Sequence, residues 1–180
     1  MKNVIILHGT GDTNKSFWFP YLKKELEKRK YKVWLPQLPN ATKPNLEDWL
    51  KFVFLNGKFS KETILIGHSA GAQLILSILE KVKVQKAILV SGYAAPLPKT
   101  SRSKKTGKLK WGKIRNNIKD IIFINSDDDP WGCNDKQGKI LFNHLGGTLI
   151  IRHNEGHMGS ATYRQPYKKF PLLIKLVEGL

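Results

Sequence analysis

Six short apolar runs, separated by amphipathic segments, dominate the sequence and do not alternate with polar residues. The cores Val4–Leu7 and Ile121–Ile124 show this most clearly. Strands have such uninterrupted apolar runs when helices cover both faces of a parallel sheet. The predicted strands are Asn3–His8, Lys32–Leu35, Thr63–Gly67, Lys86–Ser91, Asp120–Asn125 and Thr148–Arg152. We therefore predict an α/β fold with a six-stranded parallel sheet and helices on both faces.

The segments between these strands have the apolar spacing of surface helices. Leu22 and Leu26 form a narrow stripe among lysines and glutamates, which is typical of a half-solvated helix. Asn45 is a good helix cap, because its side chain accepts backbone N–H groups. With no internal repeat and no shift in composition, the 180 residues favour one domain over 1–180. The predicted helices are Phe17–Lys30, Asn45–Phe54, Ala70–Lys81, Asn134–Leu145 and Gln165–Glu178.

The segment Gly67–Gly71 reads Gly-His-Ser-Ala-Gly and lies between an apolar strand and a helical run. The pattern G-x-S-x-G in this context is a nucleophile elbow, in which a strained turn lifts the serine above the sheet. The turn also places Ser69 at a helix N-terminus, where partial positive charge favours a developing anion. A tight turn with an incidental serine is the weaker alternative, because both flanks match the elbow.

A serine nucleophile needs a base and an acid that orients the base. In hydrolases with a nucleophile elbow, the acid and then the histidine follow the serine in the chain. Asp127, Asp128 and Asp129 follow the fifth predicted strand, and a histidine-containing loop follows the sixth. Both segments lie at carboxyl ends of strands, where parallel sheets build their sites. Spacing alone does not choose between Asp128 and Asp129 for the acid.

Five histidines compete for the role of the base. His157 lies on a glycine-flanked loop beyond the last strand, with room to reach Ser69, and chain order favours it. The others are His8 at the end of the first strand, His68 within the elbow, His144 at a helix end and His153 directly after the last strand.

An oxyanion hole needs two backbone N–H groups directed at the developing charge. We expect one from Ala70, which follows the serine, and one from Thr10 in the loop after the first strand. The alternative for that loop is a phosphate-binding turn, because Gly9–Ser16 differs from the Walker pattern at Asn14, where a glycine is required. This substitution makes nucleotide binding the weaker interpretation.

Taken together and in order, several segments resemble the small serine hydrolases of the retinoblastoma-binding-protein-9 type. The resemblance covers nearly the whole chain. Its segments are His8–Asp12, Trp18–Leu26, Leu38–Asn40, Leu46–Trp49, Gly67–Gly71, Ser126–Pro130 and Gly156–His157.

The resemblance implies a compact α/β-hydrolase with a Ser–Asp–His triad and no metal or other cofactor. It implies Ser69 as the nucleophile and His157 as the base. It also implies Asp129 as the acid, because the family's acid stands immediately before the residue that matches Pro130. The implied activity is hydrolysis of small carboxylic esters or amides through an acyl-enzyme, as in a carboxylesterase or small-amide hydrolase.

The chain departs from the family in three respects. Gly132 occupies a position where the family usually has an apolar residue, and the stretch Lys99–Lys119 is unusually basic. The pocket-protein-binding motif L-x-C-x-E is absent, since Cys133 lies in Trp-Gly-Cys-Asn-Asp. Retinoblastoma binding is therefore not implied.

The charge is concentrated in one stretch. The formal net charge is +17, and Lys99–Lys119 holds nine basic residues and no acid. We expect a basic loop or lid-like segment near 92–119, bordering the pocket and attracting anionic substrates. The alternative function is a hydrolase-fold protein that binds a polyanion, either nucleic acid or an anionic surface, with Trp111 as a stacking group. It is not favoured, because no nucleic-acid module is recognisable.

The single cysteine, Cys133, excludes an internal disulfide. Because the opening apolar run is also too short for a secretory segment, we expect a reducing, cytoplasmic compartment. No apolar run approaches the roughly 18 residues of a membrane span. A redox or nucleophilic Cys133 is a third interpretation, but a plain free thiol is expected, since no dedicated partner accompanies it.

Overall fold

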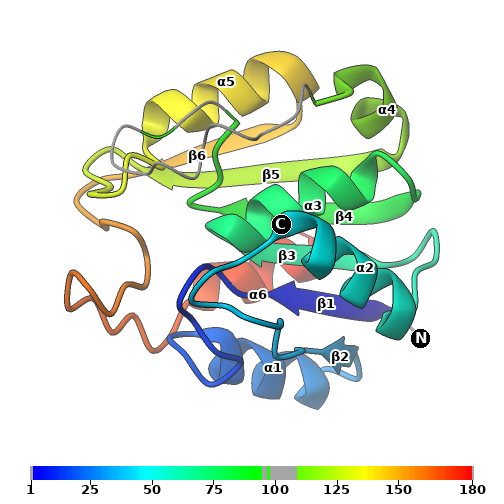
Figure 1. Cartoon of the computed structure of the whole chain (residues 1–180), viewed down its shortest axis with the longest axis horizontal. Coiled ribbons are helices and arrows are strands. Elements are labelled where there is room, and N and C mark those ends of the chain that lie inside the picture. Colours follow the sequence, from blue (N-terminus) through cyan, green and yellow to red (C-terminus); the bar gives the residue numbers. More distant parts are fainter. Residues whose placement is uncertain (1, 95–96, 98–108, 180) are drawn as a thin grey trace.

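A computed structural model of the chain describes residues 2–94, 97 and 109–179 (Figure 1). Its sheet has six parallel strands in the order β2-β1-β3-β4-β5-β6. This confirms the predicted sheet, with boundaries that differ by a few residues. The strands are β1 Asn3–Leu7, β2 Lys32–Trp34, β3 Ile64–His68, β4 Val84–Val90, β5 Ile118–Ser126 and β6 Thr148–Arg152.

Alternate residues of the central strands enter two separate apolar layers. Ile64 and Ile66 pack into one layer, and Leu65 between them packs into the other. The first layer is closed by α1 (Phe19–Lys28) and α6 (Pro171–Glu178). The second is closed by α2 (Leu46–Asn56), α3 (Ala70–Leu79), α4 (Trp111–Asn116) and α5 (Asp135–Leu145). Burial on both faces explains why the strands carry uninterrupted apolar runs.

Local contacts set where α2 and α6 begin. Asn45 caps α2 as predicted, because its Oδ1 accepts the N–H of Glu47 at 2.9 Å. The last helix begins at Pro171, later than the expected Gln165. The reason is that Gln165 pairs its backbone with Ser160 in an isolated bridge, which holds this stretch out of a helix. None of the helices in the described ranges combines the length and apolar character that crossing a bilayer requires.

The short helix α4 lies inside the predicted basic segment and was not expected from the sequence. Ile114 is fully buried against the core, and the indole of Trp111 stacks on His144 of α5 at 4.3 Å. These tertiary contacts override a local composition typical of a loop. Residues 95–96 and 98–108 of this segment, on which the lid and polyanion interpretations depend, lie outside the described residues.

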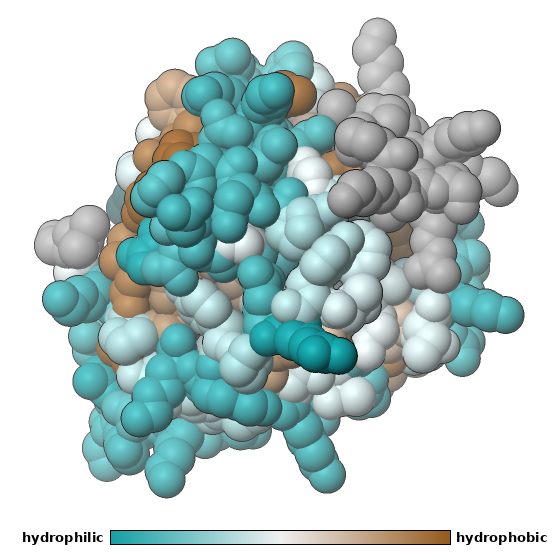
Figure 2. All heavy atoms as spheres, turned by 90° about the vertical axis from the view of Figure 1, so that its left-hand side faces the viewer, coloured by the Kyte–Doolittle hydropathy of each residue, from teal (hydrophilic) through white to brown (hydrophobic). Residues whose placement is uncertain are grey.

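All six strands point their carboxyl ends to the same edge of the sheet, on the left of Figure 1. Figure 2 views the molecule from that side and shows mainly hydrophilic and intermediate residues, with apolar residues toward one margin. The loops after β1, β3, β5 and β6 meet at this edge, and together with Ala70, the first residue of α3, they contain every residue that the sequence predicts for the site.

Candidate active site

Ser69 occupies a strained turn between β3 and α3. Its backbone has φ 53° and ψ −116°, a conformation that a residue with a Cβ rarely adopts. The turn is tied to the sheet because the Ser69 N–H donates to the Val90 carbonyl at 2.9 Å. A Cβ on Gly71 would lie 2.2 Å from the Leu7 carbonyl oxygen, so only glycine lets α3 pass this close to β1. The predicted elbow geometry is present.

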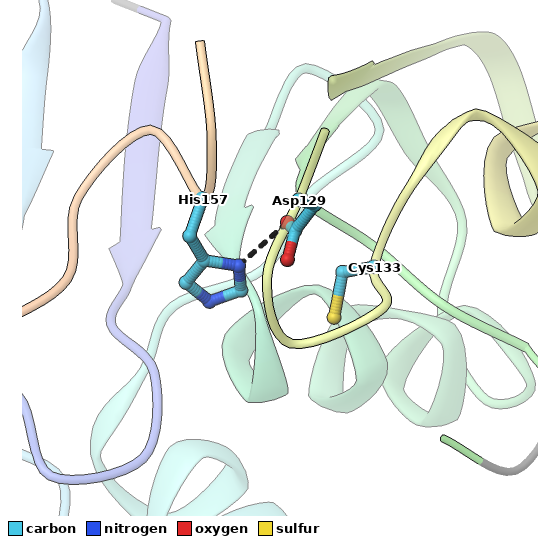
Figure 3. Close-up of side chains that lie close together, drawn as sticks. All are labelled: Asp129, Cys133 and His157. Carbon is cyan, nitrogen blue, oxygen red and sulfur yellow. Dashed lines mark hydrogen bonds and ion pairs between the residues drawn. The ribbon is translucent and has the colours of Figure 1, made fainter. Parts of the chain in front are cut away.

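Asp129 and His157 form a buried hydrogen-bonded pair (Figure 3). The distance from His157 Nδ1 to Asp129 Oδ2 is 2.7 Å, and the two residues are 4% and 6% exposed. A carboxylate only accepts, so Nδ1 carries the proton, and Nε2 of the neutral ring is left with a free electron pair. Burial lowers the pKa of His157, and the hydrogen bond to Asp129 opposes that effect. The ring is therefore ready to accept a proton near neutral pH.

The three consecutive aspartates have three different partners. Asp127 contacts the exposed His153, with Oδ2 2.7 Å from Nδ1. Asp128 Oδ1 accepts the Ser126 hydroxyl at 2.6 Å and the Gly156 N–H at 2.8 Å. Asp129 is the aspartate that contacts His157, while its Oδ1 accepts the Trp131 N–H at 2.9 Å. The structure thus brings together the acid and the base that the family resemblance implies.

The residue before Ser69 connects the elbow to the loop that carries His157. His68 Nε2 donates to the His157 carbonyl oxygen at 2.8 Å, and the two rings lie 4.8 Å apart. Among the described residues, no hydrogen bond joins the Ser69 hydroxyl to His157. Such catalytic hydrogen bonds are often long in an enzyme without substrate and shorten when substrate binds.

The loop after β1 passes directly beside the serine. A Cβ on Gly9 would lie 3.1 Å from the Ser69 Cβ, which places this loop in contact with the elbow. The Gly9 N–H donates to Asp12 at 3.1 Å, and the Gly11 N–H donates to the Ala41 carbonyl at 2.7 Å. Within the part of the chain that the structure describes, the N–H groups of Thr10 and Ala70 have no hydrogen-bond acceptor.

Two further buried histidines border the site, and the sequence assigned them no role. His8 is fully buried, with Nδ1 3.0 Å from the Gly9 carbonyl and Nε2 accepting the Leu38 N–H at 3.0 Å. Burial lowers the pKa of His8, which favours the neutral ring that these contacts require. His68 is 1% exposed and faces Asp12. The sequence signal for both was a histidine beside a glycine at the end of a buried strand.

Cys133 is the third member of a compact buried group with Asp129 and His157 (Figure 3). One ligand atom from each residue lies within 4.8 Å of the others, and this donor set suits zinc. However, a hydrogen bond already joins the carboxylate and the imidazole, and burial raises the pKa of the Cys133 thiol well above its usual value. A protonated thiol is a poor metal ligand, so the contacts favour acid–base use of the pair.

Comparison with known proteins shows the family to which the chain belongs. The family described as serine hydrolase matches residues 4–177. The chain is 35% identical to the putative hydrolase YdeN of Bacillus subtilis over 71% of each chain. It is 29% identical to the serine hydrolase RBBP9 of Rattus norvegicus over 96% of this chain and 91% of that one.

Solved structures show the same fold. The crystal structure of the B. subtilis ydeN gene product matches with a TM-score of 0.91 and 28% identity, covering 99% of this chain and 97% of that one. Mouse alpha/beta hydrolase domain-containing protein 10 matches with a TM-score of 0.71 at 14% identity, covering 98% of this chain and 88% of that one, and so shares the fold.

Fold and sequence together define the class: this is a hydrolase with a compact α/β-hydrolase fold. Within that class, the chain belongs to the serine hydrolase family, which matches residues 4–177, as the resemblance predicted.

Proposed function

We propose that this chain cleaves small carboxylic esters or amides through a Ser69–Asp129–His157 triad and an acyl-enzyme. The observation that carries the proposal is the buried 2.7 Å contact between His157 and Asp129, on a loop that His68 ties to the strained Ser69 turn. A buried imidazole held by a carboxylate beside a serine in an elbow is the arrangement that activates a hydroxyl for attack on an acyl carbon.

In this mechanism the Ser69 oxygen attacks the substrate carbonyl while His157 Nε2 takes the hydroxyl proton. Asp129 stabilises the imidazolium through Nδ1–H, and the Thr10 and Ala70 N–H groups stabilise the oxyanion. The imidazolium then gives its proton to the leaving alcohol or amine, which leaves an ester on Ser69. His157 next takes a proton from water, the hydroxide attacks this ester, and the acid departs as Ser69 regains its proton.

The reaction requires neutral His157, and burial lowers the pKa of His157 below its usual 6.5. Protonation of this ring removes the base, so kcat/KM falls as the pH drops through the pKa of His157. We expect full activity at pH 7 and an acid limb below pH 6.5.

The test combines a fluorophosphonate probe with a hydrolysis screen of p-nitrophenyl esters and aminoacyl amides. The wild-type chain should take up one probe molecule, and Ser69→Ala should lose labelling together with about ten-thousand-fold or more of kcat. Ser77→Ala is the matched control, because Ser77 lies farther along the same helix, α3, and should react like wild type. Labelling of the Ser69→Ala variant would contradict the proposal.

A further inference from the structure

Asp12 and His68 form a second histidine–carboxylate pair behind the proposed triad. His68 Nδ1 lies 3.5 Å from Asp12 Oδ2, and the two side chains are 1% and 12% exposed. The pair lies between the loop after β1 and the loop after β6. Neither residue is needed for the proton transfers of the proposed mechanism.

The contacts of His68 define where its protons are. Its Nε2 lies 2.8 Å from the His157 carbonyl oxygen, which only accepts hydrogen bonds, so Nε2 carries a proton. Its Nδ1 is buried and has no hydrogen-bond partner within normal distance in the described structure, and a carboxylate oxygen faces it. A bare electron pair there would oppose the carboxylate, whereas a proton on Nδ1 forms an ion pair with Asp12. The contact is therefore an ion pair whenever Nδ1 carries a proton.

Asp12 extends the connection to the loop beside the serine. The same Oδ2 atom that faces His68 accepts the Gly9 N–H at 3.1 Å. Gly9 immediately precedes Thr10 and lies against Ser69. A continuous path thus runs from the Gly9 amide through Asp12 and His68 to the His157 carbonyl, which also accepts the Ser91 hydroxyl at 3.0 Å.

We propose that Asp12 and His68 are positioning residues. They hold the loop that carries the Thr10 N–H at a fixed distance from the backbone carbonyl of His157, the general base. This inference rests on the proposed function of Ser69, Asp129 and His157. Neither residue touches the reacting atoms. Together they fix the separation between the Thr10 N–H and the His157 ring, on which both oxyanion stabilisation and proton transfer depend.

The surroundings of His68 argue against a role as simple filler. Its ring lies among the rings of Phe17, Trp18 and Phe19, with centroid distances of 6.1, 6.1 and 5.8 Å. An apolar side chain would fill such a cage at lower cost than a polar one, because a polar ring must keep its hydrogen bonds when buried. The polar groups of His68 are used instead to join two loops.

The pair also acts on His157 electrostatically. The titratable groups around His68 are Asp12, His8 and His157, and Asp129 lies beyond His157. A positive charge on His68 lowers the pKa of His157, whereas the charge of Asp12 raises it. Removing one member of the pair should therefore shift the titration of the base in a direction that depends on which member is removed.

The test uses two near-isosteric variants of the full chain. His68→Gln keeps an N–H donor for the His157 carbonyl but cannot carry a positive charge. Asp12→Asn keeps an acceptor for the Gly9 N–H and removes the negative charge. We expect kcat on a p-nitrophenyl ester to fall about tenfold to a hundredfold in each, with KM changed less than about threefold. The acid limb of kcat/KM should move to higher pH in His68→Gln and to lower pH in Asp12→Asn.

His153→Gln is the matched control, because His153 also pairs with an aspartate but is 81% exposed. Its kinetics should equal those of wild type. Acid limbs that move in the same direction, or do not move, would overturn the inference, as would wild-type kcat in both variants. If His68→Gln does not fold, the Asp12→Asn variant tests the inference alone, through the shift of its acid limb of kcat/KM to lower pH. Wild-type protein that neither hydrolyses esters nor labels at Ser69 would overturn the proposed function as well, whereas active wild type with unaltered variants would overturn this inference alone.

Discussion

The turn that carries Ser69 and the loop that carries His157 are held in place by different means. The serine turn depends on backbone strain at Ser69 and on the missing Cβ of Gly71, which lets the backbone pass close to the Leu7 carbonyl. The histidine loop depends on side chains from other parts of the chain. The pinning contacts are Ser126 Oγ to the Glu155 N–H, Asp128 Oδ1 to the Gly156 N–H, Gln165 Oε1 to the His157 N–H and Trp18 Nε1–H to the Met158 carbonyl.

This difference shows two routes to a rigid site. A strained turn needs small neighbours and tolerates no added atoms, whereas a side-chain-pinned loop distributes its stability over several hydrogen bonds. A single substitution in the turn should therefore cause a large loss of stability. A single substitution around the loop should cause only a small loss of activity and stability.

Among the substitutions that test this comparison, the largest effect should come from the acid that orients the base. Asp129→Asn leaves the shape unchanged but no longer stabilises a proton on His157 Nδ1, so kcat should fall about a thousandfold to ten-thousandfold in ester hydrolysis. Asp127→Asn, two residues away and paired with exposed His153, should stay within twofold of wild type. Equal losses in the two variants would mean that the aspartate run acts through folding and not through the pair.

The next effect tests the strained turn. Gly71→Ala places a Cβ 2.2 Å from the Leu7 carbonyl oxygen, and the backbone has to shift to relieve the clash. We expect the free energy of unfolding in urea to fall by about 3 kcal/mol or more. Gly112→Ala in α4 has no heavy atom within 4 Å of the new Cβ and should be neutral or slightly stabilising. If only the Gly112 variant lost stability, the close approach at Gly71 would not be what requires a glycine.

The smallest effect tests the pinned loop. Asp128→Ala removes the acceptor shared by the Ser126 hydroxyl and the Gly156 N–H, and kcat should fall about threefold to tenfold with a loss of about 1 kcal/mol in unfolding free energy. Asp128→Asn keeps an oxygen acceptor and should recover most of both quantities. If the asparagine variant is as impaired as the alanine variant, charge and not hydrogen bonding holds the loop.

The contrast between local structure and distant contacts also explains which features could be predicted from the sequence. The strands and the elbow are local patterns, so all six strands and the turn at Ser69 are found where the runs and glycines place them. Spacing did not separate Asp128 from Asp129, because their partners lie 28 positions away in the chain. The family resemblance, and not periodicity, indicated Asp129.

Other features escaped prediction because distant contacts create them. Helix α4 depends on Trp111 stacking on His144, and the late start of α6 depends on Gln165 pairing with Ser160. The Asp12–His68 pair joins two residues that are 56 positions apart, across two adjacent strands. None of these contacts leaves a periodic trace in the local sequence.

The burial of Cys133 has a practical consequence for following the molecule in solution. It is the chain's single cysteine, it has no exposed surface, and burial raises the pKa of its thiol well above the usual value. Thiol-directed reagents need a thiolate that they can reach. A cysteine introduced at an exposed position such as His153 is therefore the site where a spectroscopic label attaches to the folded chain. The wild-type sequence is in effect a cysteine-free background, in which movement of the His157 loop can be recorded without altering the core.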